Sequence, residues 1–256
     1  MLPIKKTGFT LVELSIVIVI IGLIAGGILV GKDLIKAAEI RSQVTQFAEF
    51  DVAIKTFRLK YDNSLPGDII DTTRTAYGIC CGNPLANGNG IIEGYNGVSS
   101  NLYPTYTLYS EPITFFQHLS LTGLIKGRYL TCFGCYSYED GMQFPRAKMA
   151  NAGIFAYSKA DARLAYFLGL NRSVTDNSTS AVSSLSTAGV IRPIDAYALD
   201  TKTDDGMPTT GHIRSATITA NRPAYDTSNG SCSTASTNSY NVQNTNTDCR
   251  LIVDVQ

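Results

Sequence analysis

The most continuous apolar segment of the chain lies near its N-terminus. Across residues 9–30 the side chains are apolar or small, apart from Thr10, Glu13 and Ser15. As a helix with a rise of about 1.5 Å per residue, this segment is about 33 Å long and can cross a bilayer core. An ionised side chain at the centre of a membrane helix costs roughly 2.5 kcal/mol or more. We therefore expect Glu13 to have a partner and a function.

The pattern that follows residue 30 predicts that the same helix continues in amphipathic form. Apolar residues recur there at steps of three or four or multiples of these, with charged residues between them. They are Ile40, Val44, Phe47, Ile54, Phe57 and Tyr61. Because no proline lies between Pro3 and Pro66, we predict one helix from Phe9 to about Tyr61, about 80 Å long. Its apolar stripe requires a covering domain.

Four glycines lie in the middle of this predicted helix, at positions 22, 26, 27 and 31. They form two G-x-x-x-G spacings, which let helix backbones approach closely in lipid. Each glycine also lowers helix propensity by about 1 kcal/mol relative to alanine, so a bend is expected here if anywhere. Two interpretations of these glycines are therefore left open: they serve close packing and flexibility of the helix, or they are the small residues of an ordinary membrane helix.

Turn chemistry predicts where the long helix ends and where other helices begin. In NSLPGD, residues 63–68, the proline disfavours helix in the residue before it and Gly67 can take positive φ. An amphipathic helix is expected at residues 111–125, with Pro112 in its first turn. A third helix is expected at about residues 193–199.

Short strands and long polar loops account for the remaining chain. Strands are expected at residues 154–157, 165–168, 213–218 and 251–255, the first two being ambiguous with helix. Loops are expected where Gly, Asn, Ser or Thr dominate, at residues 71–110, 173–187 and 226–248. The predicted fold class is α+β, a long N-terminal helix packed on a small antiparallel sheet.

Composition excludes some classes of partner and of chemistry. The 256 residues carry a formal net charge of zero, so the basic excess typical of nucleic-acid binding is missing. The apolar content of 44% is that of a folded chain. His118 and His212 are its two histidines, and H-E-x-x-H, G-x-S-x-G and Walker patterns do not occur. We expect neither enzymatic activity nor a catalytic cofactor.

The string Gly8-Phe9-Thr10-Leu11-Val12-Glu13 resembles the cleavage and methylation signal of type IV pilins and type II secretion pseudopilins. The resemblance implies that a prepilin peptidase cuts between Gly8 and Phe9 and then methylates the Phe9 amine. It also implies that Glu13 meets the Phe9 ammonium of a neighbouring subunit during assembly. This pairing is physically reasonable, because opposite charges brought together offset a burial cost that neither bears well alone.

Other interpretations of the N-terminus explain less. A secretory signal peptide could be cut near Ala25-Gly26-Gly27, but its apolar region would be unusually long and would contain Glu13. A lipoprotein signal needs a cysteine soon after the apolar run, and the first cysteine is Cys80. A plain anchor explains the length and leaves Glu13 unexplained.

Six cysteines follow the membrane segment, where an oxidising compartment favours disulfides. They are Cys80, Cys81, Cys132, Cys135, Cys232 and Cys249. The resemblance to type IV pilins, many of which have a C-terminal disulfide, favours a Cys232–Cys249 pair. The other four pair among themselves in an order left open. Zinc binding by those four is the alternative, although adjacent cysteines fit zinc spacing poorly.

An acidic cluster lies in DAYALDTKTDDGMPTTG, where Asp200, Asp204 and Asp205 precede Gly206. Carboxylates that converge on a turn suit Ca²⁺, and some major pseudopilins hold calcium in a C-terminal loop. The spacing does not match an EF-hand loop. The alternative, which we favour, is a helix end followed by an Asp-Gly turn.

Together these features predict a leader at residues 1–8, an N-terminal helix at 9–62 and an extracytoplasmic domain with long loops at 63–256. Residues 9–30 would span the bacterial inner membrane once, with Lys5 and Lys6 on the cytoplasmic side. The domain would face the periplasm, or belong to a filament or the cell surface. Expected partners are the prepilin peptidase/methyltransferase, other pilin-like subunits and an inner-membrane assembly platform.

The predicted function is that of a structural subunit of a pilin-like filament. A minor or unclassified type II secretion pseudopilin that serves protein export is the first hypothesis. A type IV pilin for adhesion, motility or DNA uptake is the second. A rival of another class is a membrane-tethered monomeric binding module, for which Glu13 would be dispensable.

Overall fold

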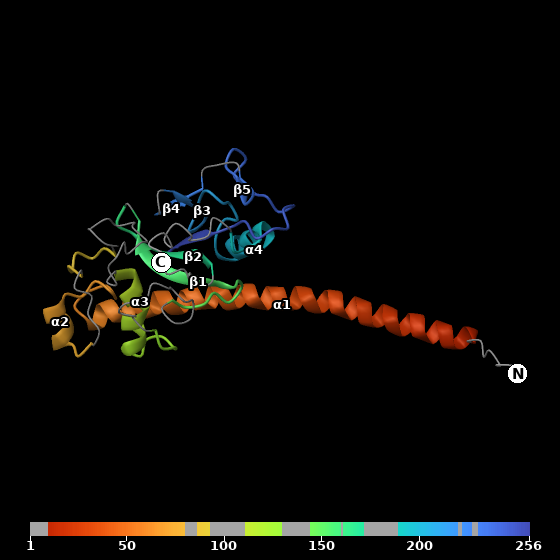
Figure 1. Cartoon of the computed structure of the whole chain (residues 1–256), viewed down its shortest axis with the longest axis horizontal. Helices are drawn as coiled ribbons and strands as arrows, with labels where there is room; N and C mark the ends of the chain where they lie inside the picture. The colour runs from red at the N-terminus through yellow and green to blue at the C-terminus, as the bar shows by residue number, and fades with distance from the viewer. Residues whose placement is uncertain are drawn as a thin grey trace, which may run out of the picture.

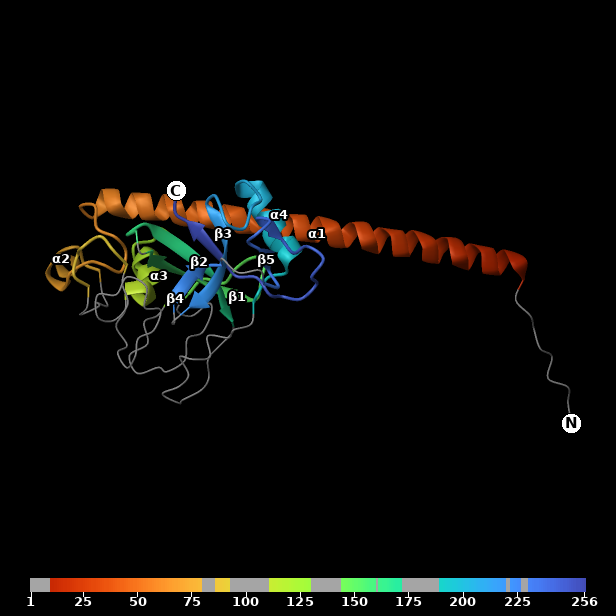
Figure 2. The ribbon, with the colours of Figure 1, turned by 90° about the horizontal axis from the view of Figure 1, so that it is seen from above.

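The computed structural model of the chain shows a long helix that carries a lobe on its C-terminal half (Figure 1). The structure describes residues 10–79, 86–92, 111–129, 144–159, 161–171, 189–219, 222–226 and 230–256. We call the described residues from 64 onward the lobe. Figures 1 and 2 show the N-terminal half of the helix projecting away from it.

The long helix, α1, runs from Leu11 to Lys60 and confirms the single helix expected from the sequence. It is α-helical through all four glycines, so they do not interrupt it. Residues 11–35, which we call the free half, present their apolar side chains to the outside. Leu11 is 86% exposed and Ile35 is 64% exposed.

The second half of α1 buries the predicted apolar stripe against the lobe. Ile40, Phe47, Ile54 and Phe57 are all buried there, together with other apolar residues of the same face. Two glutamines of this stripe are buried as well, and each has backbone partners. Gln43 Oε1 accepts a hydrogen bond from the Lys148 amide at 2.7 Å, and Gln46 Nε2 donates to the Arg146 carbonyl at 2.8 Å. These bonds satisfy polar groups that would otherwise be costly to bury.

The lobe is built on a five-stranded antiparallel sheet with the order β1-β2-β7-β3-β4. Its strands are β1 Ala152–Ser158, β2 Leu164–Asn171, β3 Ile213–Thr219, β4 Arg222–Tyr225 and β7 Leu251–Asp254. A separate hairpin joins β5 Ser233–Thr234 to β6 Ser239–Tyr240. The four predicted strands and the α+β class are therefore confirmed.

Tyr166 of β2 joins the sheet to α1 through its ring and through its hydroxyl. Its ring stacks on Phe47 with centroids 5.6 Å apart, and its hydroxyl donates to Asp51 Oδ1 at 2.8 Å. The Gln256 amide donates to the other oxygen of Asp51 at 3.2 Å. Burial raises the pKa of Asp51, while these hydrogen bonds act in the opposite direction. One carboxylate of α1 thus holds both β2 and the C-terminus.

Three short helices complete the lobe, namely α2 Asp71–Ala76, α3 Glu111–Leu121 and α4 Pro193–Thr203. The predicted second helix ends at Leu121, before Gly123, which has positive φ. The third continues to Thr203, one turn beyond the predicted end.

Two loop predictions were partly wrong. Residues 71–76 form α2, whose sequence DTTRTA has no apolar period to indicate a helix. Residues 233–240 form the β5–β6 hairpin, although this stretch is rich in Ser and Thr. Buried Tyr240 and Cys232 supply apolar anchors that short polar strands lack by themselves.

The turn after α1 joins three parts of the lobe. Gly67 has φ of +90°, and a Cβ there would lie 2.5 Å from the Glu111 carbonyl oxygen. Its amide donates to Nδ1 of buried His118 at 2.9 Å, so this histidine has a structural contact in the core. The buried Asp68 carboxylate accepts from the Gly88 and Gly90 amides at 2.7 Å each. Residues 66–68 therefore fix both α3 and the segment 86–92.

Replacing Asp68 by alanine should destabilise the lobe by about 2–4 kcal/mol, because two amides lose a charged acceptor in a buried position. Urea unfolding of the full chain in detergent, followed by circular dichroism, measures the change. Glu49→Ala, at an exposed position of α1, is the control and should leave the midpoint unchanged. Equal midpoints for the two variants would contradict the assigned role.

Candidate functional site

The start of α1 is a capping box made by Thr10 and Glu13. Thr10 Oγ1 accepts from the Glu13 amide at 3.2 Å, while the Thr10 amide and hydroxyl each donate to Glu13 Oε2 at 2.8 Å. Such reciprocal bonds satisfy helix-end amides, and the carboxylate also lies at the positive end of the helix dipole. Sequence analysis did not identify Thr10 as the N-cap residue. The T-x-x-E spacing, which is typical of a capping box, could have identified it.

The free half of α1 places this carboxylate at the end of an uncovered apolar helix. Within residues 11–30, Glu13 is the only charged side chain. By length and composition, α1 is long and apolar enough to cross a membrane. Gly22, Gly26, Gly27 and Gly31 face open space, so another helix could approach closely along them. Gly8 and Phe9 lie outside the described residues, and their processing stays a prediction.

Residues 4–29 match the family model described as the prokaryotic N-terminal methylation motif. The chain carries a prepilin signal. This is the signal of type IV pilins and pseudopilins, and the α+β fold with its long N-terminal helix is consistent with that class. The prepilin signal covers about a tenth of the chain, and the class it marks is structural rather than enzymatic. No curated protein and no solved structure matches the chain.

A disulfide joins Cys232 to Cys249 across 17 residues. It lies beside an isolated bridge in which the Ile191 and Cys249 amides each donate to the other's carbonyl, at 3.1 and 2.9 Å. The disulfide thus ties the start of the β5–β6 hairpin to the segment before β7, and the backbone hydrogen bonds of Ile191 tie that same segment to the residues before α4. Cys80, Cys81, Cys132 and Cys135 lie outside the described residues, so their pairing stays a prediction.

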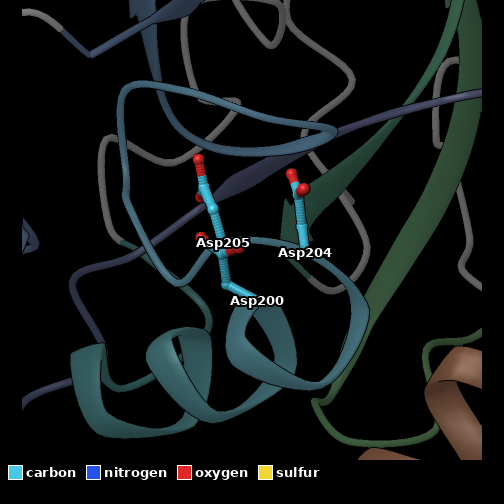
Figure 3. Close-up of side chains that lie close together, drawn as sticks. All are labelled: Asp200, Asp204 and Asp205. Carbon is cyan, nitrogen blue, oxygen red and sulfur yellow. The ribbon is translucent and has the colours of Figure 1, made fainter.

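The three aspartates of the acidic cluster converge at the end of α4 (Figure 3). One carboxylate oxygen from each of Asp200, Asp204 and Asp205 lies within 4.8 Å of the others. These residue types and this spacing could hold a cation such as Ca²⁺. Calcium binding by the three residues stays a prediction.

Each of these carboxylates also accepts a backbone amide hydrogen bond from the turn after α4, and Asp200 has a further donor in β6. Asp200 accepts from the Tyr240 hydroxyl at 2.8 Å and from the Gly206 amide at 3.1 Å. Asp205 accepts from the Met207 amide at 2.9 Å, and Asp204 accepts from the His212 amide. The cluster therefore fastens the turn between α4 and β3.

Burial raises the pKa of Asp200 to about 6, and the charges of Asp205 and Asp204 act in the same direction. The bonds from Tyr240 and Gly206 act against this rise. At pH values between the ordinary pKa of 3.8 and the raised pKa, Asp200 is protonated to a larger extent in the folded state than in the unfolded state. The contribution of Asp200 to the free energy of unfolding is therefore full below about pH 4 and is lost as the pH rises through 6.

Asp200→Asn should remove this part of the pH dependence, because an amide keeps an acceptor oxygen and does not titrate. We expect the unfolding temperature of the wild type to fall relative to that of the variant as the pH rises from 4 to 7. Differential scanning calorimetry of the full chain in detergent measures it. A parallel pH profile for both proteins would show that Asp200 does not titrate as described.

Calorimetry in calcium and in EGTA distinguishes two roles for these carboxylates, fastening the turn and binding calcium. If the carboxylates serve the turn, calcium has the same effect on the unfolding temperatures of the wild type and of Asp200→Asn at pH 7. A rise with calcium in the wild type, lost in Asp200→Asn, would support the calcium hypothesis instead.

Proposed function

We propose that this chain is a subunit of a pilin-like filament, specifically a minor or unclassified pseudopilin of a type II secretion system. The observation that carries the proposal is Glu13 at the start of an exposed apolar helix, within a matched prepilin signal. Support for the pseudopilin comes from the LPGD turn and the unusual size of the domain. Its proposed role is export of proteins through a short periplasmic filament.

In this proposal, processing creates the group that Glu13 needs. Cleavage between Gly8 and Phe9 gives an ammonium four residues before Glu13, which a methyl group leaves positively charged. In the single chain, Thr10 supplies hydrogen bonds to Glu13. In the filament, the Phe9 ammonium of a neighbouring subunit would pair with this carboxylate and set the axial register. The ammonium and the carboxylate both carry charge, whereas the Thr10 donors are neutral, so the ion pair in an apolar bundle can replace the Thr10 bonds.

Assembly would also move the free half of α1 from lipid into contact with other helices. Lipid contacts would be replaced by contacts with neighbouring helices, along which the two G-x-x-x-G spacings permit close approach. The prepilin peptidase, the other subunits and an inner-membrane platform are the proposed partners, and the lobe is placed in the periplasm.

A type IV pilin is the second candidate, and the Cys232–Cys249 disulfide favours it. The two candidates share processing and assembly and differ in the phenotype of a strain without the protein. Loss of exported proteins from the medium supports the pseudopilin, whereas loss of surface fibres with export intact supports the pilin.

Processing predicts a mature chain that starts at Phe9 and carries one added methyl group. Intact mass and N-terminal sequencing of the protein, from cells with and without the prepilin peptidase, measure this. Gly8→Phe should leave the leader in place, because it alters the residue at the cleavage site. A chain that starts at Met1 in the presence of the peptidase, or is cut after Gly27, would contradict the proposal.

Glu13→Ala should leave membrane insertion and processing intact and abolish assembly. Its carboxylate is the only charge of residues 11–30, so nothing else there can pair with a neighbour's ammonium. Cross-linking of subunits in membranes measures assembly, and the ladder of oligomers should be lost. Ser15→Ala is the matched control, two residues away and also exposed, and should assemble normally. Assembly of Glu13→Ala would favour the tethered binding module.

A further inference from the structure

Four successive backbone amides, those of residues 88–91, donate hydrogen bonds to side-chain oxygens. The first and the third donate to the two carboxylate oxygens of Asp68, at 2.7 Å each. The second donates to Asn87 Oδ1 at 2.9 Å, and the fourth donates to Asn89 Oδ1 at 2.8 Å. The side-chain oxygens of three residues are therefore gathered along one short stretch of backbone.

The order of residues in this stretch is that of the first half of an EF-hand calcium loop. In such a loop, positions 1, 3 and 5 supply side-chain oxygens, position 6 is an invariant glycine, and position 7 supplies its backbone carbonyl. With Asn87 at position 3, Asn89 falls at position 5 and Gly90 at position 6. Gly90 has a positive φ of +77°, which suits the sharp turn of that position. The carbonyl of Ile91 is then at position 7.

The acidic residue that begins such a loop comes here from another part of the chain. Position 1 of this register is Leu85, whose side chain has no oxygen. Asp68 supplies a carboxylate to the loop instead, from the turn after α1, where the Gly88 and Gly90 amides hold it. Asp68 lies 20 residues before Gly88, so no contiguous sequence motif reveals the arrangement.

The negative charge of Asp68 is a separate indication of a bound cation. Asp68 is 1% exposed, and in the part of the chain that the structure describes no lysine, arginine or histidine forms an ion pair with it. Each of its oxygens accepts one amide hydrogen bond, whereas a carboxylate has about four lone-pair sites. Buried charges in proteins are paired with other charges or coordinate metals. A cation beside Asp68 would therefore compensate a charge that is otherwise costly to bury.

We propose that Asp68, Asn87, Asn89 and the Ile91 carbonyl form a calcium site that joins the segment 86–92 to the turn after α1. Carboxylate, amide and carbonyl oxygens are the ligands that Ca²⁺ takes in proteins. With one carboxylate among these ligands, we expect a dissociation constant of about 10⁻⁴–10⁻³ M, the range of extracellular modules. The site lies at the end of the lobe where α1 ends, whereas α4 with its acidic cluster lies nearer the free half (Figure 1). It goes beyond the proposed function, because it requires neither processing nor assembly.

Calorimetry of the full chain in detergent tests whether calcium binds. Calcium at about 10 mM should raise the unfolding temperature of the wild type by about 3–10 °C relative to EGTA, given the expected dissociation constant. Magnesium at the same concentration should raise it less, because Mg²⁺ loses its water reluctantly and requires near-ideal octahedral geometry. The rise with calcium should persist in Asp200→Asn, which leaves this site intact.

Two substitutions at the exposed Asn89 should change calcium affinity in opposite directions. Asn89→Ala removes a ligand and should weaken binding about ten-fold, whereas Asn89→Asp adds a charged ligand and should tighten binding about ten-fold, as measured by isothermal titration calorimetry. Aspartate and asparagine both form this kind of turn, so a purely structural role predicts no gain from Asn89→Asp. Asn63→Asp is the control, because it adds the same charge at an exposed turn outside the loop, and it should leave the dissociation constant unchanged.

Three results would overturn the proposal. The first is a wild-type chain with the same unfolding temperature in calcium and in EGTA. The second is an Asn89→Asp variant that binds calcium no more tightly than Asn63→Asp. The third is calcium binding that Asp200→Asn abolishes and Asn89→Ala retains, which would assign the ion to the acidic cluster at the end of α4.

Discussion

The main physical constraint on this structure is that the free half of α1 requires an apolar environment. Its 25 residues expose isoleucine, leucine and valine side chains that the lobe leaves uncovered. Water is a poor solvent for such a surface, so lipid or other helices must surround it. The lobe is thus attached to a segment that has two possible environments, and the proposed function requires the segment to move between them. Glu13 is suited to this change because its carboxylate is at the helix start, where a new partner can reach it.

Most of the fold could be predicted because its elements have strong periodic patterns. The length of α1 followed from apolar residues up to Tyr61 and from the first later proline, Pro66. The four predicted strands were also found, since each has a run of apolar or β-branched residues. Helix α2 and the β5–β6 hairpin were missed because they are short and polar, and tertiary contacts rather than local pattern hold them.

The sequence pointed to the residues of the candidate site and not to the contacts that these residues make. The prepilin string identified Glu13, but its bonds to Thr10 require the capping geometry. The acidic string identified Asp200, yet its partner Tyr240 lies 40 residues away in sequence, and no spacing rule connects the two. The same holds for Lys36 and Asp195, whose ion pair depends on how α4 crosses α1. Long-range pairs of this kind come from packing of the lobe as a whole.

The polar side chains on the covered half of α1 also determine how the subunit responds to a mechanical load. Gln43 and Gln46 bond to the backbone of residues 146–148, and Asp51 bonds to Tyr166 and Gln256. These bonds run from the helix to the lobe over about 12 Å of its axis. A force that pulls α1 along that axis would stretch them together rather than one after another. The lobe would therefore follow the helix as a rigid body when a subunit is drawn out of the membrane.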